Sequence, residues 1–378
     1  MFDRYHNILA RLRAPLLLAL AIGLAWLVFE SIAYRSGAYF RIAEPDSNTG
    51  AVVTALQVLE REHRPQARNI LVFGDSRVGE GFSPQRAAAG DPRFNFINLA
   101  VPASTARTWY YLLRAIDRRG YTYDAVVVGT LYRSTHAELL ADWPIDAAHA
   151  AGLVGLRDGW SFPATFQAPA QRDRARYAAL LPALNLRQDT QALLEAPLER
   201  FTKIVHGRPA YLDALRVYAG REEEMPVVEF SASSPGKVKA SVIDWGNSTP
   251  AQRLQVAAIL GDSTPRPPAM IAGNDAFLGR WLGSMARITQ RRGALLIVYP
   301  LPRGPYRVLF GTDSRLPPAL EALRHRSQVM VLPPGLLAEL ESPQFFFDPL
   351  HANRAGRERT GSVVGARVRG ALTQGAAR

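Results

Sequence analysis

The sequence contains no cysteine among its 378 residues. Disulfide bonds, thiolate metal sites and a cysteine nucleophile are therefore excluded. Apart from His351, the histidines show no metal-ligand spacing among themselves, so we predict no metal site. Gly79-Glu80-Gly81 fits neither a dinucleotide fingerprint nor a phosphate-binding P-loop. We therefore expect a protein without a cofactor.

Acidic residues are also few, and the formal net charge is +12. Part of the excess lies at the C-terminal end, where residues 352–378 contain six Arg and one Glu. Nucleic-acid binding would require basic residues clustered with aromatic platforms or a recognisable module, and neither is present. We interpret the Arg-rich tail as a solvated helix face, with contact to anionic lipid or polysaccharide as the alternative.

One long apolar run is present near the N-terminus. Residues 14–29 carry no charge, and the run extends to residue 34 if Glu30 lies at headgroup level, which is about the ~20 residues that cross a bilayer. Trp26 and Tyr34 fall where aromatic rings favour the membrane interface. We predict a retained transmembrane helix over residues 14–34, with a cleaved signal peptide as the alternative. Basic residues before the span favour a cytoplasmic N-terminus.

Five short apolar runs bounded by turn residues predict strands buried on both faces of a parallel sheet. They cover residues 69–73, 94–99, 124–128, 294–299 and 328–332. Helical patterns lie between them, at 51–62, at 104–120 with Ser104 as the expected cap, and at 275–290. Alternating strands and helices predict a doubly wound α/β fold with its site beyond the C-terminal strand ends.

The stretch over residues 134–268 breaks this alternation, and we expect it to form a helical cap inserted beside the site. The predicted organisation is then a cytoplasmic tail (1–13), the membrane span (14–34), a linker with a lead-in helix (35–68) and a catalytic domain (69–378). The aromatic cluster at residues 109–111 is interpreted as core, with a sugar-binding platform as the alternative.

A serine follows the first predicted strand, in the run LVFGDSR over residues 71–77. Serine needs an adjacent base to act as a nucleophile, and Asp348-x-x-His351 near the C-terminus can supply it. His351 would take the Ser76 proton while Asp348 orients the imidazole. Asp75 is expected to stabilise the turn. The Gly-x-Ser-x-Gly nucleophile elbow of α/β-hydrolases is absent, which excludes that template.

These motifs resemble the SGNH (GDSL-like) hydrolase superfamily. More narrowly, Gly-Asp-Ser-Arg at 74–77, Asn-Leu-Ala-x-Pro at 98–102 and Asp-x-x-His-x-Asn-x-x-Gly at 348–356 resemble membrane-anchored periplasmic polysaccharide O-acetyltransferase proteins. The alginate acetylation proteins and the D-alanyl transfer protein of teichoic acid synthesis are the groups concerned. The resemblance covers roughly residues 69–133 and 271–370. It implies an SGNH-type sheet of about five strands with helices on both faces.

The sequence departs from that family at the oxyanion hole, which the family builds with a Gly after the second strand and an Asn after the third. Ala103 or Ser104 stands where the Gly is expected, and Thr130 or Arg133 would have to replace the Asn. Losing one such donor typically costs about 10²–10³ in rate, so vigorous free hydrolysis is not expected. Arg77 either binds an anionic substrate group or pairs with a nearby carboxylate.

The resemblance implies an extracytoplasmic serine O-acyltransferase, acting on a polysaccharide through an acyl-Ser76 ester. It also implies a multi-spanning membrane acyltransferase as donor, and a single-pass location in the bacterial inner membrane with the catalytic domain on the periplasmic side. Two alternatives stay open. One is an acetylesterase of the same fold, and the other is a non-catalytic scaffold of an exopolysaccharide assembly.

Overall fold

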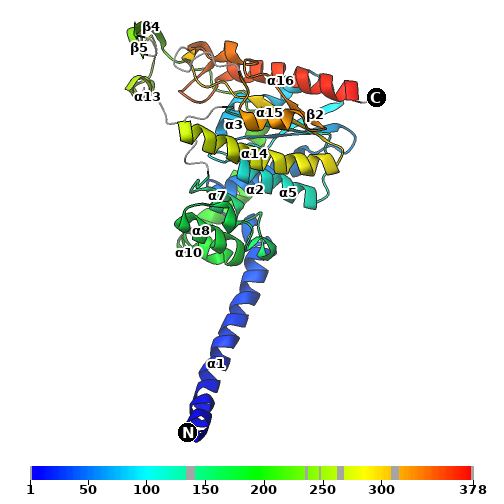
Figure 1. The fold of residues 1–378 in the computed structure, drawn as a ribbon, viewed down its shortest axis with the longest axis vertical. Coiled ribbons are helices and arrows are strands. Elements are labelled where there is room, and N and C mark those ends of the chain that lie inside the picture. The colour runs from blue at the N-terminus through cyan, green and yellow to red at the C-terminus, as the bar shows by residue number, and fades with distance from the viewer. Residues whose placement is uncertain are drawn as a thin grey trace.

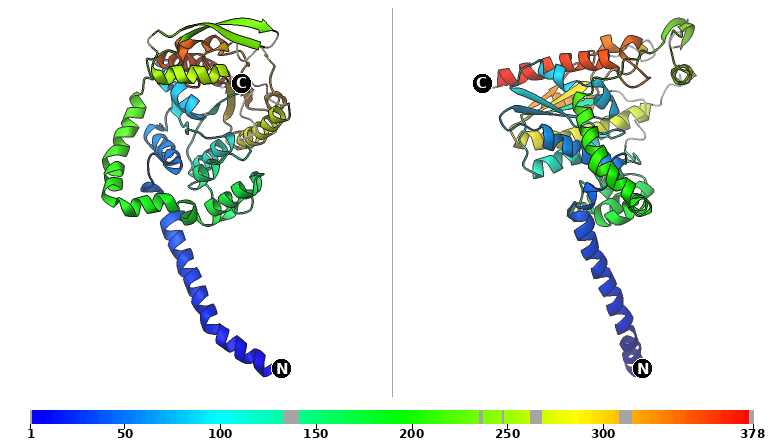
Figure 2. Two further views of the ribbon diagram at one scale, coloured as in Figure 1. Left: turned by 90° about the vertical axis from the view of Figure 1, so that its left-hand side faces the viewer. Right: turned by 180° about the vertical axis from the view of Figure 1, so that it is seen from behind.

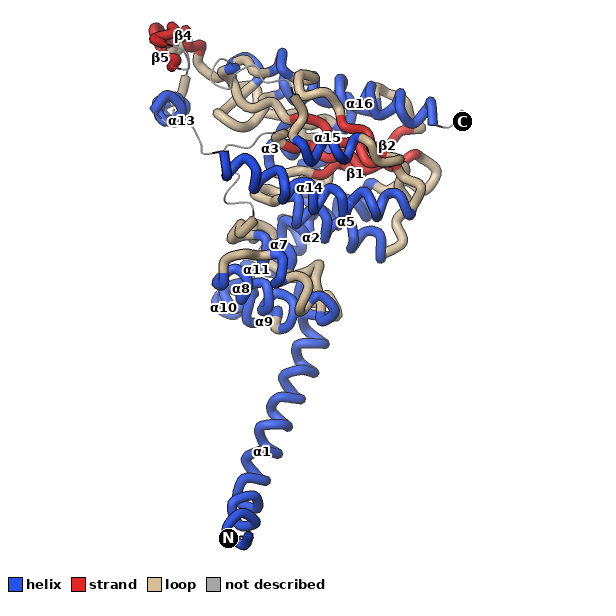
Figure 3. Tube along the Cα trace, in the orientation of Figure 1, coloured by secondary structure: helices blue, strands red, loops and turns tan. Residues whose placement is uncertain are grey.

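The centre of the protein is a five-stranded parallel sheet with the strand order β2-β1-β3-β6-β7. The computed structural model describes residues 2–132, 141–234, 237–246, 248–261, 268–307 and 315–375. The strands are β1 (Arg68–Phe73), β2 (Phe94–Asn98), β3 (Ala125–Thr130), β6 (Leu295–Pro300) and β7 (Val329–Val331). All five strands predicted from the apolar runs are confirmed, and Figure 3 shows them as one layer between helices.

Successive side chains of the inner strands enter two separate hydrophobic cores, because neighbouring residues of a strand point to opposite faces. Leu71 and Phe73 pack on one face of the sheet, while Ile70 and Val72 pack on the other. All four are fully buried. This is why the runs read as continuously apolar rather than alternating.

Helices cover both faces, as Figure 1 shows for α16 on one side of the sheet and α14 on the other. The first core contains side chains from α2 (Asn48–Glu62), α5 (Ala106–Arg118) and α14 (Pro268–Arg291). The second contains side chains from α3 (Ser76–Gly81), α4 (Pro84–Ala88) and α16 (Arg354–Gly375). The short helix α15 (Pro318–Arg324) packs against α14 and β7. The α/β fold with helices on both faces is thus confirmed.

Polar side chains cap the starts of two of these helices. Asn353 caps α16, since its side-chain oxygen accepts a hydrogen bond from the Gly356 N–H at 3.1 Å. The cap of α5 is Thr105 and not Ser104. The Ser104 hydroxyl instead donates to the Gly74 carbonyl and accepts a hydrogen bond from the Trp109 indole.

The N-terminal helix α1 (Phe2–Glu30) projects away from the rest of the protein and continues into a π-helical turn, η1 (Ser31–Arg35) (Figure 1). A short 3-10 turn, η2 (Tyr39–Arg41), follows. The predicted helix over residues 14–34 is confirmed, and residues 14–41 contain an apolar stretch long enough to cross a membrane, with little of it buried. Leu17, Leu20 and Leu24 are all more than 60% exposed, which a bilayer would relieve.

The end of this helix differs from the expected membrane-interface arrangement. Glu30 is fully buried and accepts a hydrogen bond from the Ala183 N–H at 3.1 Å. Tyr34 is also buried, and its hydroxyl lies 3.0 Å from that of Thr190. Glu30 therefore does not lie free at headgroup level. Glu30 and Tyr34 both hold the inserted segment, through contacts that no local pattern indicates.

The inserted segment between β3 and α14 contains the expected helices and also an unpredicted antiparallel hairpin, β4 (Val227–Ser234) and β5 (Lys237–Asp244). Its helices are α7 (Asp146–Ala150), α8 (Pro169–Leu180), α9 (Pro182–Asn185), α10 (Arg187–Glu195), α11 (Pro197–Thr202), α12 (Arg208–Val217) and α13 (Pro250–Gly261). Figure 2 shows this segment running from the end of α1 along one side of the sheet to the hairpin at the far end.

A buried ion pair attaches the start of the inserted segment to α5. Arg107 donates to Asp146 at 2.8 Å, and both side chains are essentially inaccessible. The hydroxyls of Thr105 and Thr108 also donate to Asp146, and Arg107 donates further to the Thr165 carbonyl. Because a buried charge is costly without such partners, this network fixes α7 on the sheet domain.

We predict that His149, also on α7, makes the free energy of unfolding depend on pH. The side chain is fully buried, neither ring nitrogen has a hydrogen-bond partner among the described residues, and burial lowers its pKa to about 4. In the unfolded chain this histidine has its ordinary pKa near 6.5, so between about pH 6.5 and 4 the unfolded state binds a proton that the folded state does not. Stability is therefore lost as the pH falls through this window. The loss should approach roughly 3 kcal/mol at low pH.

The measurement is the midpoint of urea unfolding between about pH 7.5 and 4.5. His149→Phe, which cannot be protonated, should flatten the pH dependence. The matched change His325→Phe, at an exposed histidine, should leave it as in the wild type. Equal slopes for His149→Phe and the wild type would contradict the assignment to this residue.

Candidate active site

Ser76 is held at the carboxyl end of β1 by a tight turn. Gly74 lies in this turn because a side chain there would collide with Val78, whose nearest atom would be 2.1 Å from a Cβ. Asp75 caps α3 by accepting a hydrogen bond from the Arg77 N–H at 2.9 Å. Its carboxylate also pairs with the Arg77 guanidinium. Asp75 thus stabilises the turn. Of the two roles predicted for Arg77, the structure shows the pairing with a nearby carboxylate.

The loop before α16 brings a histidine and an aspartate to the same serine. His351 Nε2 lies 2.8 Å from Ser76 Oγ, although 275 positions separate them in the chain. His351 Nδ1 lies 2.7 Å from Asp348 Oδ2. The other oxygen, Asp348 Oδ1, accepts hydrogen bonds from the backbone N–H groups of Leu350 and His351 at 2.8 and 2.7 Å. The three predicted residues therefore form one continuous hydrogen-bonded chain.

The charge state of Asp348 follows from these contacts. Burial alone would raise the pKa of Asp348, but the hydrogen bonds from the His351 ring and from the two backbone N–H groups outweigh it and lower the pKa below its usual value. A carboxylate facing Nδ1 favours the tautomer that protonates this nitrogen and leaves Nε2 free as an acceptor. In that tautomer His351 can accept the proton of the Ser76 hydroxyl.

The residues predicted for the oxyanion site are only partly brought together. Ser76 and Ala103 line the same cavity. Ser104 is buried, and its hydroxyl is already engaged by Gly74 and Trp109. Thr130 is the buried last residue of β3. Arg133 lies outside the described residues.

Ala103 has an unusual backbone conformation for a residue with a side chain. Its φ is +54°, in the left-handed region that glycine adopts readily. A non-glycine residue in this region costs about 1–2 kcal/mol. The chain therefore keeps a glycine-like conformation at this position although the residue is alanine. Its backbone N–H has no hydrogen-bond partner among the described residues, so it is free to donate to a bound group.

A cavity of about 520 Å³ adjoins Ser76. Its walls come from α2, from the α3–α4 region, and from α12 of the inserted segment with the residue that follows it, including Tyr211, Leu215 and Tyr218. The inserted segment thus forms one wall of the site. It does not seal the site, because the His351 and Asp348 side chains each remain 21% exposed.

The sequence analysis did not foresee that the inserted segment also supports the histidine loop. Gln252, which is buried, donates to the carbonyl groups of Glu224 and Phe347 at 3.1 Å. The Phe347 ring stacks on the His351 ring, with centroids 5.8 Å apart and 13° between planes. The Arg221 guanidinium lies over the Phe347 ring, 4.8 Å from its centroid. No local signal marks Gln252 or Arg221, because both act only through contacts distant in the chain.

Arg357 is a second residue that the sequence analysis missed. It is 3% exposed, lies one turn into α16 and donates to the carbonyl groups of Gly79 and Glu80 at 2.6 and 2.9 Å. These carbonyls are near the end of α3, the helix that begins with Ser76. Arg357 therefore ties the helix carrying the serine to the helix that follows the histidine loop. The prediction that the Arg-rich tail forms a solvated helix face is therefore wrong for Arg357.

Two rings of the aromatic cluster at residues 109–111 belong to the core. Trp109 and Tyr111 are each 3% exposed, and the Tyr111 ring packs against Phe162 and Trp281. No three His, Asp or Glu side chains gather as metal ligands within the described part of the chain.

Substitution of Gly74 tests how closely the turn controls the serine. In Gly74→Ala the new methyl group would overlap Val78, so α3 must shift and carry Ser76 with it. A misplacement of about 1 Å can cost about 10²-fold in rate. We expect the rate of Ser76 labelling by a fluorophosphonate to fall by about that factor. Gly79→Ala is the matched control, since its methyl group would meet its nearest neighbour at an ordinary 3.7 Å. Similar rates for both variants would show that the turn tolerates displacement.

Comparison with known proteins adds no identification. No protein-family profile matches the chain, and a sequence search of curated proteins finds no match.

Proposed function

We propose that the protein is a membrane-anchored serine O-acyltransferase of the SGNH class. Its substrate would be a cell-surface or exported polysaccharide, and the group transferred would be acetyl. The observation that carries the proposal is the continuous hydrogen-bonded chain from Ser76 through His351 to Asp348, at the carboxyl edge of a parallel sheet. General-base chemistry needs these three groups in this order, and the adjoining cavity offers room for a substrate.

The proposed reaction has two halves with one acyl-enzyme between them. Ser76 Oγ attacks the carbonyl carbon of the donor ester, and its proton passes to His351 Nε2. The donor oxygen leaves with that proton, so Ser76 carries the acyl group as an ester. A sugar hydroxyl then attacks this ester, and its proton passes to Nε2 and on to Ser76 Oγ as the acyl group leaves. Asp348 stabilises the imidazolium formed in each half.

Two backbone N–H groups are suited to stabilise the oxyanion. Ser76 is the first residue of α3, so its N–H has no acceptor within the helix. The N–H of Ala103 is likewise free and belongs to the same cavity wall. Each donor of this kind contributes about 10²–10³ in rate. The side chains of Ser104 and Arg77 are engaged elsewhere, so the proposal assigns them no direct part.

Transfer is favoured over hydrolysis by the position of the site on its anchor. The apolar helix α1 would keep the enzyme beside a membrane-made donor, which we propose comes from a multi-spanning acyltransferase. The cavity wall formed by α12 and the residue after it offers the aromatic rings of Tyr211 and Tyr218, of the kind that contact sugars, while the Tyr218 hydroxyl already donates to Glu80. The bacterial inner membrane, with the catalytic domain on the periplasmic side, is the location that fits this role.

The test supplies the purified full-length protein in detergent with 4-nitrophenyl acetate, with and without oligosaccharide acceptors. A transferase should form acetyl-Ser76, detectable by mass spectrometry of the peptide, and should lose it slowly in water. The right acceptor should accelerate its loss and become acetylated. Rapid acetate release without acceptor dependence would instead make the protein an esterase. No acylation of Ser76 by any activated ester would favour the non-catalytic scaffold.

A further inference from the structure

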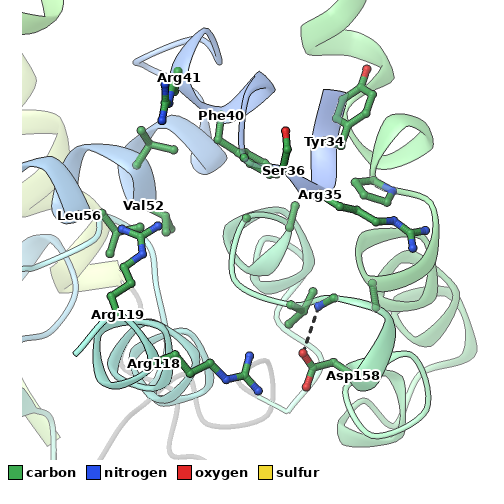
Figure 4. A pocket seen from close by; sticks show the side chains of 18 of the residues that line it. Tyr34, Arg35, Ser36, Phe40, Arg41, Val52, Leu56, Arg118, Arg119 and Asp158 are labelled. Atoms are coloured by element: carbon green, nitrogen blue, oxygen red, sulfur yellow. Dashed lines mark hydrogen bonds between the residues drawn. The ribbon is translucent and has the colours of Figure 1, made fainter. Parts of the chain in front are cut away.

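A second and larger cavity lies at the junction between α1 and the rest of the protein, far along the chain from the serine site. Its volume is about 1030 Å³, and Figure 4 shows it from close by. Its walls are the turns after α1, one side of α2, the C-terminal end of α5 and the segment over residues 151–158. None of these lining residues belongs to the cavity beside Ser76.

The lining of this junction cavity is strongly basic. Five arginines contribute to it: Arg35, Arg41, Arg118, Arg119 and Arg157. Only two carboxylates do, Glu60 and Asp158, and Asp158 is already paired with Arg114 at 2.7 Å. Figure 4 shows Arg118 and Arg119 extending from α5 into the hollow.

Four of these arginines have no countercharge of their own. Arg41, Arg118, Arg119 and Arg157 are exposed and form no ion pair within the described part of the chain. Like charges gathered around a hollow repel one another unless an anion neutralises them. Arginine suits phosphate in particular, because its planar guanidinium donates two parallel hydrogen bonds to phosphate oxygens.

The position of the cavity relative to the apolar helix indicates where such a phosphate comes from. The uncharged run of α1 ends at Phe29, and the first cavity residue, Tyr34, follows five positions later. At a helical rise of about 1.5 Å per residue, this places the cavity wall roughly 8 Å beyond the apolar run. The headgroup layer of a bilayer begins at that boundary and is of similar depth.

Exposed apolar side chains beside the cavity also indicate that it lies at the level of the lipid headgroups. Leu156, in the cavity wall, is 57% exposed, and nearby Trp160 is 87% exposed. Large apolar side chains this exposed are unfavourable in water, and tryptophan is enriched at membrane interfaces. Both residues lie between α7 and α8 in the chain, and Figure 1 shows these two helices at the end of the protein from which α1 projects.

We propose that the junction cavity binds the phosphate headgroup of an anionic glycerophospholipid. The arginines would hold the phosphate, while Leu156 and Trp160 contact the acyl boundary. Such a lipid would fix the inserted segment against the membrane surface, and so set the orientation of the sheet domain on its anchor. The inference does not depend on the reaction at Ser76.

The test measures thermal unfolding of the full-length protein in a non-ionic detergent by tryptophan fluorescence. Phosphatidylglycerol, phosphatidylethanolamine with the same acyl chains, and glycerol 1-phosphate are added separately. A ligand present at about 100 times its Kd should raise the midpoint by about 3–4 °C in a chain of this size. We expect this shift with phosphatidylglycerol and at most a small part of it with the other two.

Variants assign the shift to the cavity. Arg118→Gln/Arg119→Gln should keep the midpoint of the lipid-free protein, because both side chains are exposed and unpaired, and should lose most of the phosphatidylglycerol shift. Arg41→Gln/Arg157→Gln, on the other walls, should also reduce it. The matched control Arg326→Gln/Arg367→Gln removes the same charge from exposed positions outside the cavity and should respond like the wild type.

Three results would overturn the proposal. One is an equal shift with phosphatidylethanolamine, which would indicate general lipid solvation of α1. Another is a full shift with glycerol 1-phosphate, which would indicate a site for a water-soluble phosphate. The third is an undiminished phosphatidylglycerol shift in both cavity variants.

Discussion

Replacing Ser76 by alanine should abolish covalent labelling of the protein by a serine-reactive fluorophosphonate. The Ser76 hydroxyl is the one that lies 2.8 Å from His351 Nε2, and this contact is what makes a serine nucleophilic. Removal of a triad nucleophile typically costs about 10⁶ in turnover, so labelling should fall to background. Intact-protein mass spectrometry before and after incubation measures the adduct directly.

The control for this variant is Ser362→Ala. Ser362 is exposed on α16, and its hydroxyl donates only to the Glu358 carbonyl one turn earlier. Its loss should leave the labelling rate unchanged. Persistent labelling of Ser76→Ala would move the nucleophile to another residue and remove the basis of the proposed function.

The second large effect is expected from Asp348→Asn. Asparagine can keep one oxygen in place to accept the backbone N–H groups of Leu350 and His351. Its amide group would then replace Oδ2 opposite His351 Nδ1 and donate where the carboxylate accepted. His351 would shift its proton to Nε2 and could no longer accept from Ser76. This loss of the working tautomer typically costs about 10⁴ in rate.

The rate of Ser76 acylation by an activated ester, followed at neutral pH, measures this effect. Asp213→Asn provides the comparison, because Asp213 is 71% exposed and forms only a surface ion pair with Arg61. That change should alter the rate little. A reduction of less than about tenfold in Asp348→Asn would contradict the orienting role, since the wrong tautomer cannot sustain general-base catalysis.

The parts of the protein that the sequence predicted well are those determined by local periodicity. The five strands and the lead-in helix α2 were placed within a few residues of their observed bounds, and the apolar helix was placed correctly at its C-terminal end, although α1 already begins at Phe2. Strands buried on both faces must be continuously apolar, and a helix exposed to lipid must be apolar all round, so both leave a pattern in the chain. The candidate site was predictable for a related reason. Parallel strands meet at one edge, so residues just beyond them converge.

The parts that the sequence could not indicate depend on contacts between distant segments. The hairpin β4–β5 is not one of these parts. Its strands alternate apolar and polar residues, with Val228, Phe230 and Ala232 in β4 and Val238, Ala240 and Val242 in β5, and this local signal was missed. Gln252 and Arg357 support the site through carbonyl groups that any residue could supply.

By itself, the sequence determined the order of the five sheet strands along the chain, the apolar N-terminal helix and the candidate serine, histidine and aspartate. Each of these follows from residue type and spacing, which the chain carries locally. Only the tertiary structure decided that Glu30 and Tyr34 would be buried by the inserted segment, and that the same segment would support the His351 loop through Gln252. The junction cavity also belongs to this second group, because its arginines come from segments over 100 residues apart. Burial and charge clustering are properties of packed surfaces, and they arise only once distant parts of the chain meet.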